Sequence, residues 1–383
     1  MNTKKMNFEV VLPILLCYIV MGFVDIVGVS TGFARRDFNL SPEMAQLIPF
    51  MVFVWFFFLS IPVSVLQHNL GKRKVLLFGI LFTTVGMFLP FIYYSYGMLL
   101  VCFVLLGIGN TIIQVSSNPL LQDVVAKERF SSFMSLSQFI KAISSLVGPL
   151  IVTFAVSRYG DWKLVFLVYG ITSSIAGLWL MLTPVEESSS EERASFGSAL
   201  KLLKNPFIAA MVLAIFLIVG LDVGMNTNIQ NLLTSQFGIS LEQASIGISI
   251  YFTALMITRF LGALILSKID NLKFLYWSSL LTILLLVVLV FSTSILMAQV
   301  VIFLIGLTSG NLFPLIFSLT VNKMPERANE ISGLMTMAVV GGAVIPPVMG
   351  LINKSFGVQL SFVVLVLSAL YVFVTYYIIK KRG

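Results

Sequence analysis

Residues 105–151 read LLGIGNTIIQVSSNPLLQDVVAKERFSSFMSLSQFIKAISSLVGPLI. Two apolar segments in this stretch flank one short polar turn, QDVVAKERFSS. The same layout returns at residues 304–352 as LIGLTSGNLFPLIFSLTVNKMPERANEISGLMTMAVVGGAVIPPVMGLI, where Gly306 stands 199 residues after Gly107. The chain is therefore predicted to be a duplication, and the repeated unit is predicted to be a pair of membrane helices around a charged turn.

The repeat extends beyond these two stretches. Glu128-Arg129 correspond to Glu326-Arg327, and Gly148-Pro149 to Pro346-Pro347. FNLSPEMA at residues 38–45 returns as FGISLEQA at residues 237–244, again with an offset of 199. Two halves of similar sequence, read in the same direction, predict a parallel repeat of two helix bundles.

The composition excludes a soluble protein. Of 383 residues, 58% are hydrophobic and 10% are charged, and the mean hydropathy is +1.02, whereas a soluble domain carries roughly 25% charged residues. The net charge of +8 does not indicate nucleic-acid binding, because 17 of the 24 Lys and Arg fall in predicted turns on one side and five on the other. This asymmetry indicates a polytopic membrane protein whose basic side faces the cytoplasm.

Twelve segments are apolar enough, at about 20 residues each, to span a membrane. We expect an all-α fold with an N-terminal six-helix bundle at 1–183, a cytoplasmic linker at 184–205 that includes a surface helix, FGSALKLLKN, and a C-terminal six-helix bundle at 206–383. Both termini are expected in the cytoplasm, and the first span is expected to remain in the mature protein. The expected spans are 8–32, 43–66, 75–94, 98–121, 132–156, 163–183, 206–231, 242–266, 274–292, 295–320, 329–352 and 360–379.

Four charged residues lie inside predicted spans: Asp25, Lys141, Asp222 and Arg259. Charged side chains inside a membrane are costly, so they usually face a partner or a water-filled cavity. One interpretation is a pair of buried salt bridges that only fixes the helix register. The other is that Asp25 or Asp222 binds a coupling ion or proton, while Lys141 tunes that carboxylate or contacts substrate.

Polar side chains recur at helical spacing inside the same spans. Residues three or four apart share a helix face, so each pair presents two hydrogen-bonding groups on one side, as recognition of a polyhydroxylated substrate requires. Gln230 and Asn231 are instead explained by an exposed helix end. The residues predicted to line a substrate cavity are Asn110, Gln114, Asn118, Gln138, Lys141 and Asn226.

No catalytic signature is found in the sequence. The glycine-rich VVGGAVIPP, residues 339–347, lacks the Lys-Ser/Thr and the preceding strand of a phosphate-binding loop. Its glycines are expected to permit close helix approach and bending. We therefore expect no enzyme, no metal site, and no cofactor apart from a coupling ion, H⁺ or Na⁺.

The whole chain resembles a major facilitator transporter and, more narrowly, the fucose–proton symporter family of sugar carriers. Five stretches carry the resemblance: QVSSNPLL at 114–121, LSQFIKAISSLVGP at 136–149, TRFLGALILSK at 258–268, FPLIFSLTV at 313–321 and MTMAVVGGAVIPPVMG at 335–350. The facilitator signature between spans two and three is present only as SVLQHNLGKRK, with His68 for its usual Asp and Asn69 for its usual Arg.

The resemblance implies roles for several residues and also marks departures. Gln138 matches a glutamine that contacts sugar, and Arg259 matches the arginine of span eight, for which we expect a gating role through carbonyls or an acid at the inner end. Asp222 matches a Gln or Glu position. Lys141 stands where the family has a sugar-binding Asn, and Gln114 where it has a protonatable Glu.

The acid of span one in the family falls on Gly28, with Asp25 one turn earlier. Three possibilities therefore stay open: Asp25 or Asp222 has replaced the missing acids, Na⁺ replaces H⁺, or transport is uncoupled.

From these features we expect a secondary transporter in the inner membrane that takes up a sugar or sugar derivative by alternating access. Its expected partners are this small molecule and the lipid bilayer, with no nucleic acid, and it is expected to be a monomer. The first alternative is a proton-coupled drug or metabolite antiporter of the same fold. The second alternative is a non-transporting receptor or scaffold. The helices of such a protein would not need charged residues at the membrane midplane.

Overall fold

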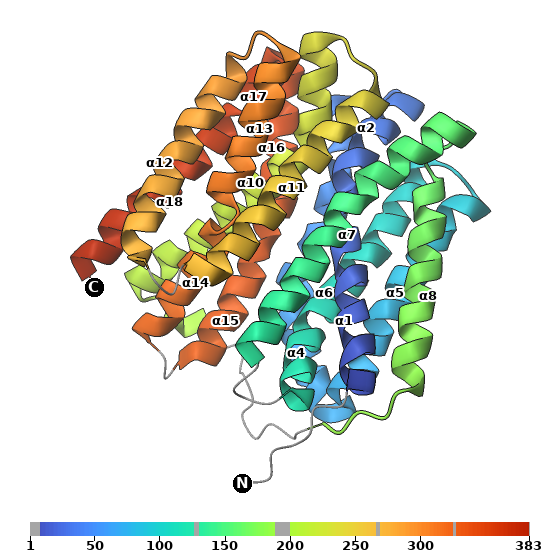
Figure 1. Ribbon diagram of the computed structural model, residues 1–383, viewed down its shortest axis with the longest axis vertical. Coiled ribbons are helices and arrows are strands. Elements are labelled where there is room, and N and C mark those ends of the chain that lie inside the picture. Colours follow the sequence, from blue (N-terminus) through green and yellow to red (C-terminus); the bar gives the residue numbers. More distant parts are fainter. Residues whose placement is uncertain (1–7, 126–129, 188–199, 266–268, 325–326, 383) are drawn as a thin grey trace.

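The computed structural model describes residues 8–125, 130–187, 200–265, 269–324 and 327–382. Within these ranges, twelve helical segments are long and apolar enough to span a membrane, as the sequence predicts. Figure 1 shows the spans running broadly along the long axis of the molecule. Twelve spans return the chain to the side of the membrane from which it started.

The first six spans, which we call the N-half, lie before residue 183. Their helices are α1 (Phe8–Gly22), η1 (Phe23–Ile26), α2 (Val27–Asp37), α3 (Pro42–Ala45), α4 (Leu47–Leu70), α5 (Lys72–Ile92), α6 (Tyr96–Val124), α7 (Phe130–Tyr159) and α8 (Leu164–Leu182). The first span comprises α1, η1 and α2.

The last six spans, which we call the C-half, begin at Pro206. Their helices are α10 (Pro206–Phe237), α11 (Leu241–Ile265), α12 (Asn271–Val290), α13 (Ile295–Ser309), α14 (Leu312–Lys323), α15 (Ala328–Met337), η4 (Ala338–Val340), α16 (Gly341–Phe356), α17 (Val358–Ser361) and α18 (Val363–Arg382). Residues 188–199 of the expected linker and surface helix lie outside the described residues, so the expected domain boundaries stay predictions.

The predicted duplication is visible in how the helices pack. Gly107 on α6 faces the Val52 carbonyl of α4, and Gly306 on α13 faces the Tyr251 carbonyl of α11; an added Cβ would lie 2.3 Å and 2.8 Å from these oxygens. Val52 and Tyr251 are themselves 199 residues apart. The same glycine therefore makes the same close helix contact in both halves. Residues 128, 129 and 326, which form part of the sequence repeat, lie outside the described residues.

Three spans that the sequence predicts as continuous helices are interrupted: the tenth breaks between α13 and α14 at Gly310 and Asn311, and two others contain a 3₁₀ turn. The first changes to the 3₁₀ turn η1 at Phe23–Ile26, and the eleventh to η4 at Ala338–Val340. Each turn adjoins a glycine, Gly22 or Gly341, and glycine weakens a helix. Irregular backbone at membrane depth is tolerated where protein covers it, and Phe23, Val24 and Ile26 are buried.

The expected basic turn between spans two and three is almost entirely helical. We expected span two to end near residue 66, but α4 continues to Leu70 and α5 starts at Lys72. Gly71 alone separates them, with φ of 89°. This backbone region suits glycine because it has no Cβ, so one residue reverses the chain and the basic side chains are on helix ends.

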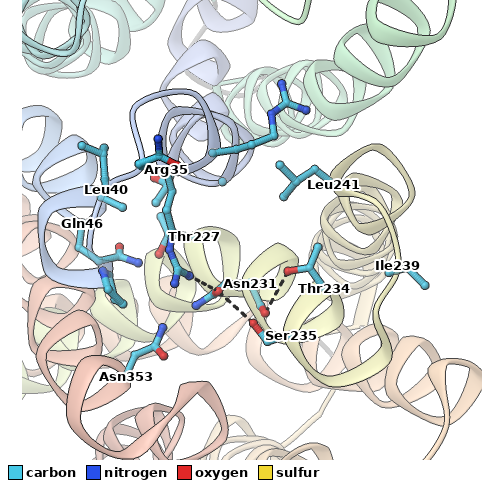
Figure 2. A pocket seen from close by; sticks show the side chains of 16 residues that line it. Arg35, Leu40, Gln46, Thr227, Asn231, Thr234, Ser235, Ile239, Leu241 and Asn353 are labelled. Carbon is cyan, nitrogen blue, oxygen red and sulfur yellow. Dashed lines mark hydrogen bonds between the residues drawn. The ribbon is translucent and has the colours of Figure 1, made fainter.

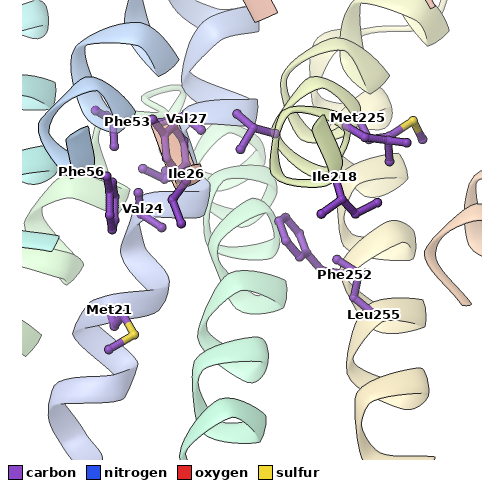
Figure 3. Close-up of a cluster of buried hydrophobic side chains, with 14 of the residues drawn as sticks. Met21, Val24, Ile26, Val27, Phe53, Phe56, Ile218, Met225, Phe252 and Leu255 are labelled. Atoms are coloured by element: carbon purple, nitrogen blue, oxygen red, sulfur yellow. The ribbon is translucent and has the colours of Figure 1, made fainter. Parts of the chain in front are cut away.

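The helix pairs that join the two halves include α2 with α10, α3 with α16, α4 with α16, and α7 with α11. Between them lies a cluster of buried apolar side chains from the first, second, seventh and eighth spans (Figure 3). Its members include Met21, Val24, Ile26, Val27, Phe53, Phe56, Ile218, Met225, Phe252 and Leu255. The predicted close approach of the glycines in span eleven is confirmed, because a Cβ on Gly342 would lie 2.9 Å from both Phe53 and Val223.

Candidate functional site

The four charges predicted inside the spans lie near one another, although they come from both halves. Asp25 is in η1, Lys141 on α7, Asp222 on α10 and Arg259 on α11. The charges of Lys141, Asp222 and Arg259 all act on Asp25, and that of Lys141 is the strongest. All four side chains are partly exposed. We call these residues the charge cluster.

Direct salt bridges do not hold the charge cluster together. All four residues are described, and none of their cationic nitrogens lies within 4.0 Å of a carboxylate oxygen of any residue that the structure describes. The structure therefore does not contain the pair of salt bridges that one interpretation of the sequence proposed to fix the helix register. Charges that act on each other without direct pairing remain available to an ion or a ligand.

Each carboxylate of the charge cluster instead accepts a hydrogen bond from a hydroxyl. Ser145 on α7 donates to Asp25 Oδ2, and the Tyr251 hydroxyl donates to Asp222 Oδ1 at 2.7 Å. A hydroxyl can donate to a carboxylate and accept from a carboxylic acid, so both contacts can persist when a proton binds.

Neither hydroxyl was predicted from the sequence. Ser145 was within reach of sequence reasoning because it lies four residues after Lys141 and shares its helix face. Tyr251 is 29 residues from Asp222 and on another helix, so no local pattern points to it.

Asn110 and Asn226 are buried and bind the backbone of the interrupted first span. Asn110 Nδ2 donates to the Met21 carbonyl at 2.7 Å, and Asn226 Nδ2 donates to the Asp25 carbonyl at 2.8 Å. One contact therefore precedes η1 and the other lies within it. Their Oδ1 atoms are buried and have no hydrogen-bond partner in the described part of the chain. These amides position Asp25, and their contact with substrate stays a prediction.

Gln114, Asn118 and Gln138 are partly exposed. Asn118 Oδ1 accepts a hydrogen bond of 2.7 Å from the Tyr18 hydroxyl. The side-chain amides of Gln114 and Gln138 have no hydrogen-bond partner among the residues that the structure describes. Two amides without a protein partner, on α6 and α7, can therefore bond a ligand.

Gly28 occupies the position at which the resemblance implies an acid, and it packs against the other half. A Cβ on Gly28 would lie 1.9 Å from Asn226 Oδ1 and 2.4 Å from the Asn226 carbonyl. No side chain fits there while α2 and α10 are in contact. Asp25 is therefore the carboxylate that the first span brings to the charge cluster.

Arg259 lacks the partner that we expected at an inner gate. It makes no hydrogen bond or ion pair to any described residue, and its charge acts on Asp25, Lys141 and Tyr251. Its place is with the charge cluster, and its gating role stays a prediction.

The prediction that Gln230 and Asn231 lie at an exposed helix end was wrong. Helix α10 continues to Phe237, and Gln230 is buried, with Nε2 donating to Ser245 Oγ at 2.6 Å. Asn231 accepts a hydrogen bond from Arg35 Nη1 of the N-half. These amides join helices, because α10 extends six residues beyond the predicted end of the span at 231, which is about 1.7 turns.

Polar contacts join the halves at the end of the bundle that carries segments 37–47, 159–164, 237–241 and 356–358. We call it the outer end, since the basic turns predict that the opposite end faces the cytoplasm. Lys354 Nζ pairs with Glu43 Oε1 at 2.5 Å, and Gln46 Nε2 donates to Asn228 Oδ1 at 3.1 Å. The Lys354 hydrogen bond holds the pKa of Glu43 below its usual range. The outer end is therefore closed.

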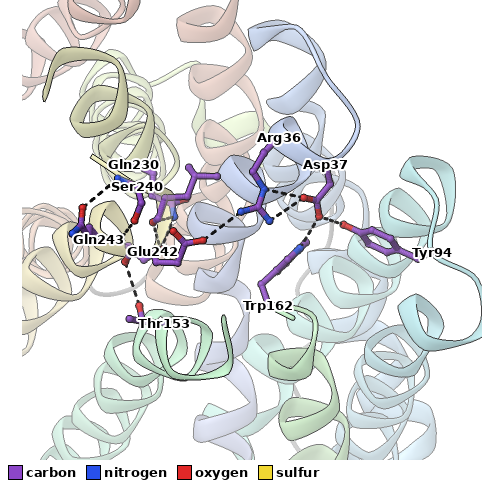
Figure 4. Close-up of polar contacts among 11 residues, drawn as sticks. Arg36, Asp37, Tyr94, Thr153, Trp162, Gln230, Ser240, Glu242 and Gln243 are labelled. Carbon is purple, nitrogen blue, oxygen red and sulfur yellow. Dashed lines mark hydrogen bonds and ion pairs between the residues drawn. The ribbon is translucent and has the colours of Figure 1, made fainter. Parts of the chain in front are cut away.

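Asp37 is the centre of a second outer-end cluster (Figure 4). It accepts hydrogen bonds from the Tyr94 hydroxyl at 2.7 Å and from Trp162 Nε1 at 2.8 Å. Arg36 pairs with Asp37 at 3.0 Å and with Glu242 of the C-half at 3.3 Å. Burial raises the pKa of the Tyr94 hydroxyl, and the Asp37 charge raises it further.

Comparison with known proteins finds related transporters over most of the chain. A curated glucose/galactose transporter of Brucella abortus biovar 1 (strain 9-941) is 24% identical over 374 residues, covering 93% of this chain and 90% of the relative. A putative glucose/galactose transporter of Helicobacter pylori (strain ATCC 700392 / 26695) is 23% identical over 362 residues, covering 88% of this chain and 87% of the relative.

Solved structures show the same fold. A bacterial homologue of the human lysosomal transporter Spinster, inward-facing and unoccupied, has a TM-score of 0.79 at 15% identity, with 99% of this chain and 98% of that chain covered. The major facilitator transporter FucP in its outward conformation has a TM-score of 0.71 at 17% identity, with 97% and 98% covered.

The family model of the Major Facilitator Superfamily matches residues 14–339 and residues 212–383 of this chain. That match covers most of both halves, and it agrees with the twelve spans and with the packing of the duplicated glycines. The chain belongs to the major facilitator superfamily.

Proposed function

We propose that this chain is a secondary active transporter that takes up a monosaccharide or sugar derivative, coupled to H⁺ or Na⁺, by alternating access. The observation that carries the proposal is the charge cluster between the halves. Asp25 and Asp222 come from opposite halves, each accepts a hydrogen bond from a hydroxyl, and neither forms a direct salt bridge with a described residue. Carboxylates in this state can take up and release a coupling ion within one transport cycle.

A sugar is the substrate class best supported. The two curated relatives reported above are named as glucose/galactose transporters. Gln114 and Gln138 present amides with no partner among the described residues, and such groups bond sugar hydroxyls through both donor and acceptor atoms. These observations favour sugar over the drug or metabolite antiport alternative. They also favour transport over a receptor or scaffold, and over an enzyme.

The closed outer end supports alternating access. Ion pairs and hydrogen bonds join the halves there, and rocking of one half against the other would break them. We place the chain in the inner membrane with both termini in the cytoplasm, and we propose that it works as a monomer with no cofactor other than the coupling ion. Asp25 and Asp222 are its proposed ion-binding residues.

The test is uptake by the purified protein in proteoliposomes. Radiolabelled glucose, galactose, fucose and glucuronate are offered with a pH gradient, with a Na⁺ gradient, and with neither. Accumulation of one sugar above equilibrium under one gradient is the expected result. Equilibration without accumulation under every gradient would contradict coupling, and a failure to transport any sugar would contradict the substrate class.

A further inference from the structure

A pocket of about 590 Å³ lies at the outer end, and Figure 2 shows the side chains that line it. Residues of both halves line it, including Arg35 and Gln46 from the N-half and Asn231 and Asn353 from the C-half. None of the four residues of the charge cluster belongs to its lining. The proposed transport site therefore leaves this pocket without a role.

Arg35 gives the pocket its charge. It is partly exposed, it has no carboxylate partner among the described residues, and Nη1 donates to Asn231 Oδ1. Its Nε and Nη2 atoms have no protein acceptor in the described part of the chain. These two nitrogens form the edge of a guanidinium that binds a carboxylate or phosphate through two parallel hydrogen bonds.

The second arginine in the pocket is already neutralised. Arg36 binds Asp37 through Nε and Nη2 and Glu242 through Nη1. Neither of these acids lines the pocket, and none of the described residues that line it is an Asp or a Glu. The pocket therefore offers one cation without a counter-ion and no carboxylate to repel an anion.

The remaining polar lining suits hydroxyl groups. Thr227, Thr234, Ser235 and Asn353 line the pocket together with Arg35. Gln46 Oε1 is buried there with no hydrogen-bond partner among the described residues, although its Nε2 is used. A buried acceptor without a donor is costly, and a ligand hydroxyl would satisfy it.

We propose that this outer pocket is a second binding site, for a small oxyanion that carries hydroxyl groups, of the sugar-acid class. The oxyanion pairs with the free edge of Arg35, and the hydroxyls bond the amide and hydroxyl lining. The site is formed from both halves. A ligand that needs both favours the conformation in which they touch, so occupancy stabilises the closed outer end and slows the transport cycle.

Direct binding tests the site without relying on transport, so this proposal and the proposed sugar transport can fail separately. Calorimetric titration of the purified full chain uses glucuronate, with glucose and inorganic phosphate as comparison probes. We expect glucuronate to bind more tightly than either. Glucose binding that is as tight as that of glucuronate and is weakened equally by Arg35→Gln would overturn the role of the charge, and phosphate binding that meets both conditions would overturn the role of the hydroxyl lining.

Three variants assign the binding to Arg35. Arg35→Gln is expected to weaken glucuronate binding about tenfold or more, since hydrogen bonds to a charged group are lost. Arg35→Lys keeps the positive charge but lacks the two parallel N–H donors of the guanidinium, so we expect an intermediate loss of glucuronate binding. Arg158→Gln is the matched control, because Arg158 is exposed at the outer end and outside the pocket. Unchanged binding by Arg35→Gln, or an equal loss in Arg158→Gln, would overturn the site.

A distance measurement tests the effect on conformation. Tyr159 and Phe356 end their helices at the outer end, one in each half, and their exposed fractions are 66% and 70%. Spin labels are attached after Tyr159→Cys and Phe356→Cys; native Cys17 and Cys102 are buried. Glucuronate should narrow the distance distribution in this background and not in the Arg35→Gln background. A wider distribution with glucuronate would overturn the stabilising effect.

Discussion

The Tyr251 hydroxyl donates a hydrogen bond of 2.7 Å to Asp222, across the contact between α11 and α10. Tyr251 also supplies the carbonyl against which Gly306 packs. Its backbone therefore anchors the eighth span to the tenth, while its side chain reaches the charge cluster. A change in the occupancy of Asp222 is thus connected directly to the packing of the C-half.

Tyr251→Phe should change the ion dependence of transport and leave the fold intact. The ring remains while a hydrogen bond to a charged group is lost, so we expect about a tenfold change in the half-maximal H⁺ or Na⁺ concentration. The measurement is initial uptake rate against ion concentration. Tyr276→Phe is the control, because the Tyr276 ring packs on Phe373 and Tyr376 away from the cluster. An identical ion dependence in Tyr251→Phe would remove this hydrogen bond from the coupling mechanism.

Asp25→Asn should abolish gradient-driven accumulation and keep part of the counterflow exchange. Asparagine retains the size of the side chain and a hydrogen-bonding oxygen for Ser145, but it cannot take up a proton or hold a cation by charge. Exchange does not require the ion cycle and should persist. Both are measured in the same proteoliposomes. Wild-type accumulation by the variant would exclude Asp25 from coupling.

Lys141→Asn distinguishes two roles for the cation. A lysine at the centre of a span costs about 2.5–3.5 kcal/mol on insertion scales, and Asp25 is the charge that acts on it most strongly. We expect neutral-sugar binding to be retained and the pH or Na⁺ dependence of transport to change. Selective loss of acidic-sugar transport would instead show that Lys141 contacts an anionic substrate.

Gly28→Ala should impair transport much more than Gly97→Ala. The new methyl would lie 1.9 Å from Asn226 Oδ1, so α2 and α10 must separate, whereas an added Cβ on helical Gly97 meets nothing within 4 Å. We expect a wider outer end in spin-label distances and a lower uptake rate for Gly28→Ala at equal expression. Equal rates in the two variants would show that this contact is not needed.

Acid should weaken the closed outer end through Glu43. Because the Lys354 hydrogen bond lowers the pKa of Glu43, its contribution to closure is complete above the usual pKa of Glu, about 4.3. This contribution is lost as the pH falls through the lowered pKa of Glu43. Spin-label distances between residues 159 and 356 should widen over that acidic range. Glu43→Gln should remove this step, and a step that persists in Glu43→Gln would assign it to another group.

The fold was predictable because a membrane span depends on composition and a repeat on simple comparison. The four residues of the charge cluster were found for the same reason, since a charge in an apolar span is conspicuous. The interruption at η1, the Tyr251 contact and the burial of Gln230 were not found. Each depends on how two helices distant in sequence approach each other, and the periodicity of one helix contains no information about its partner.

Arg36 also bears on the energetics of opening. Its guanidinium is shared between Asp37 on its own helix and Glu242 on the opposite half. When the halves move apart, Arg36 stays paired with Asp37, and the carboxylate of Glu242 becomes hydrated at the surface. No ion is stranded in a dry environment, and an exposed ion pair contributes only about 0–1 kcal/mol. The ion pair between Arg36 and Glu242 can therefore break and re-form in every transport cycle by thermal motion alone, without a chemical source of energy.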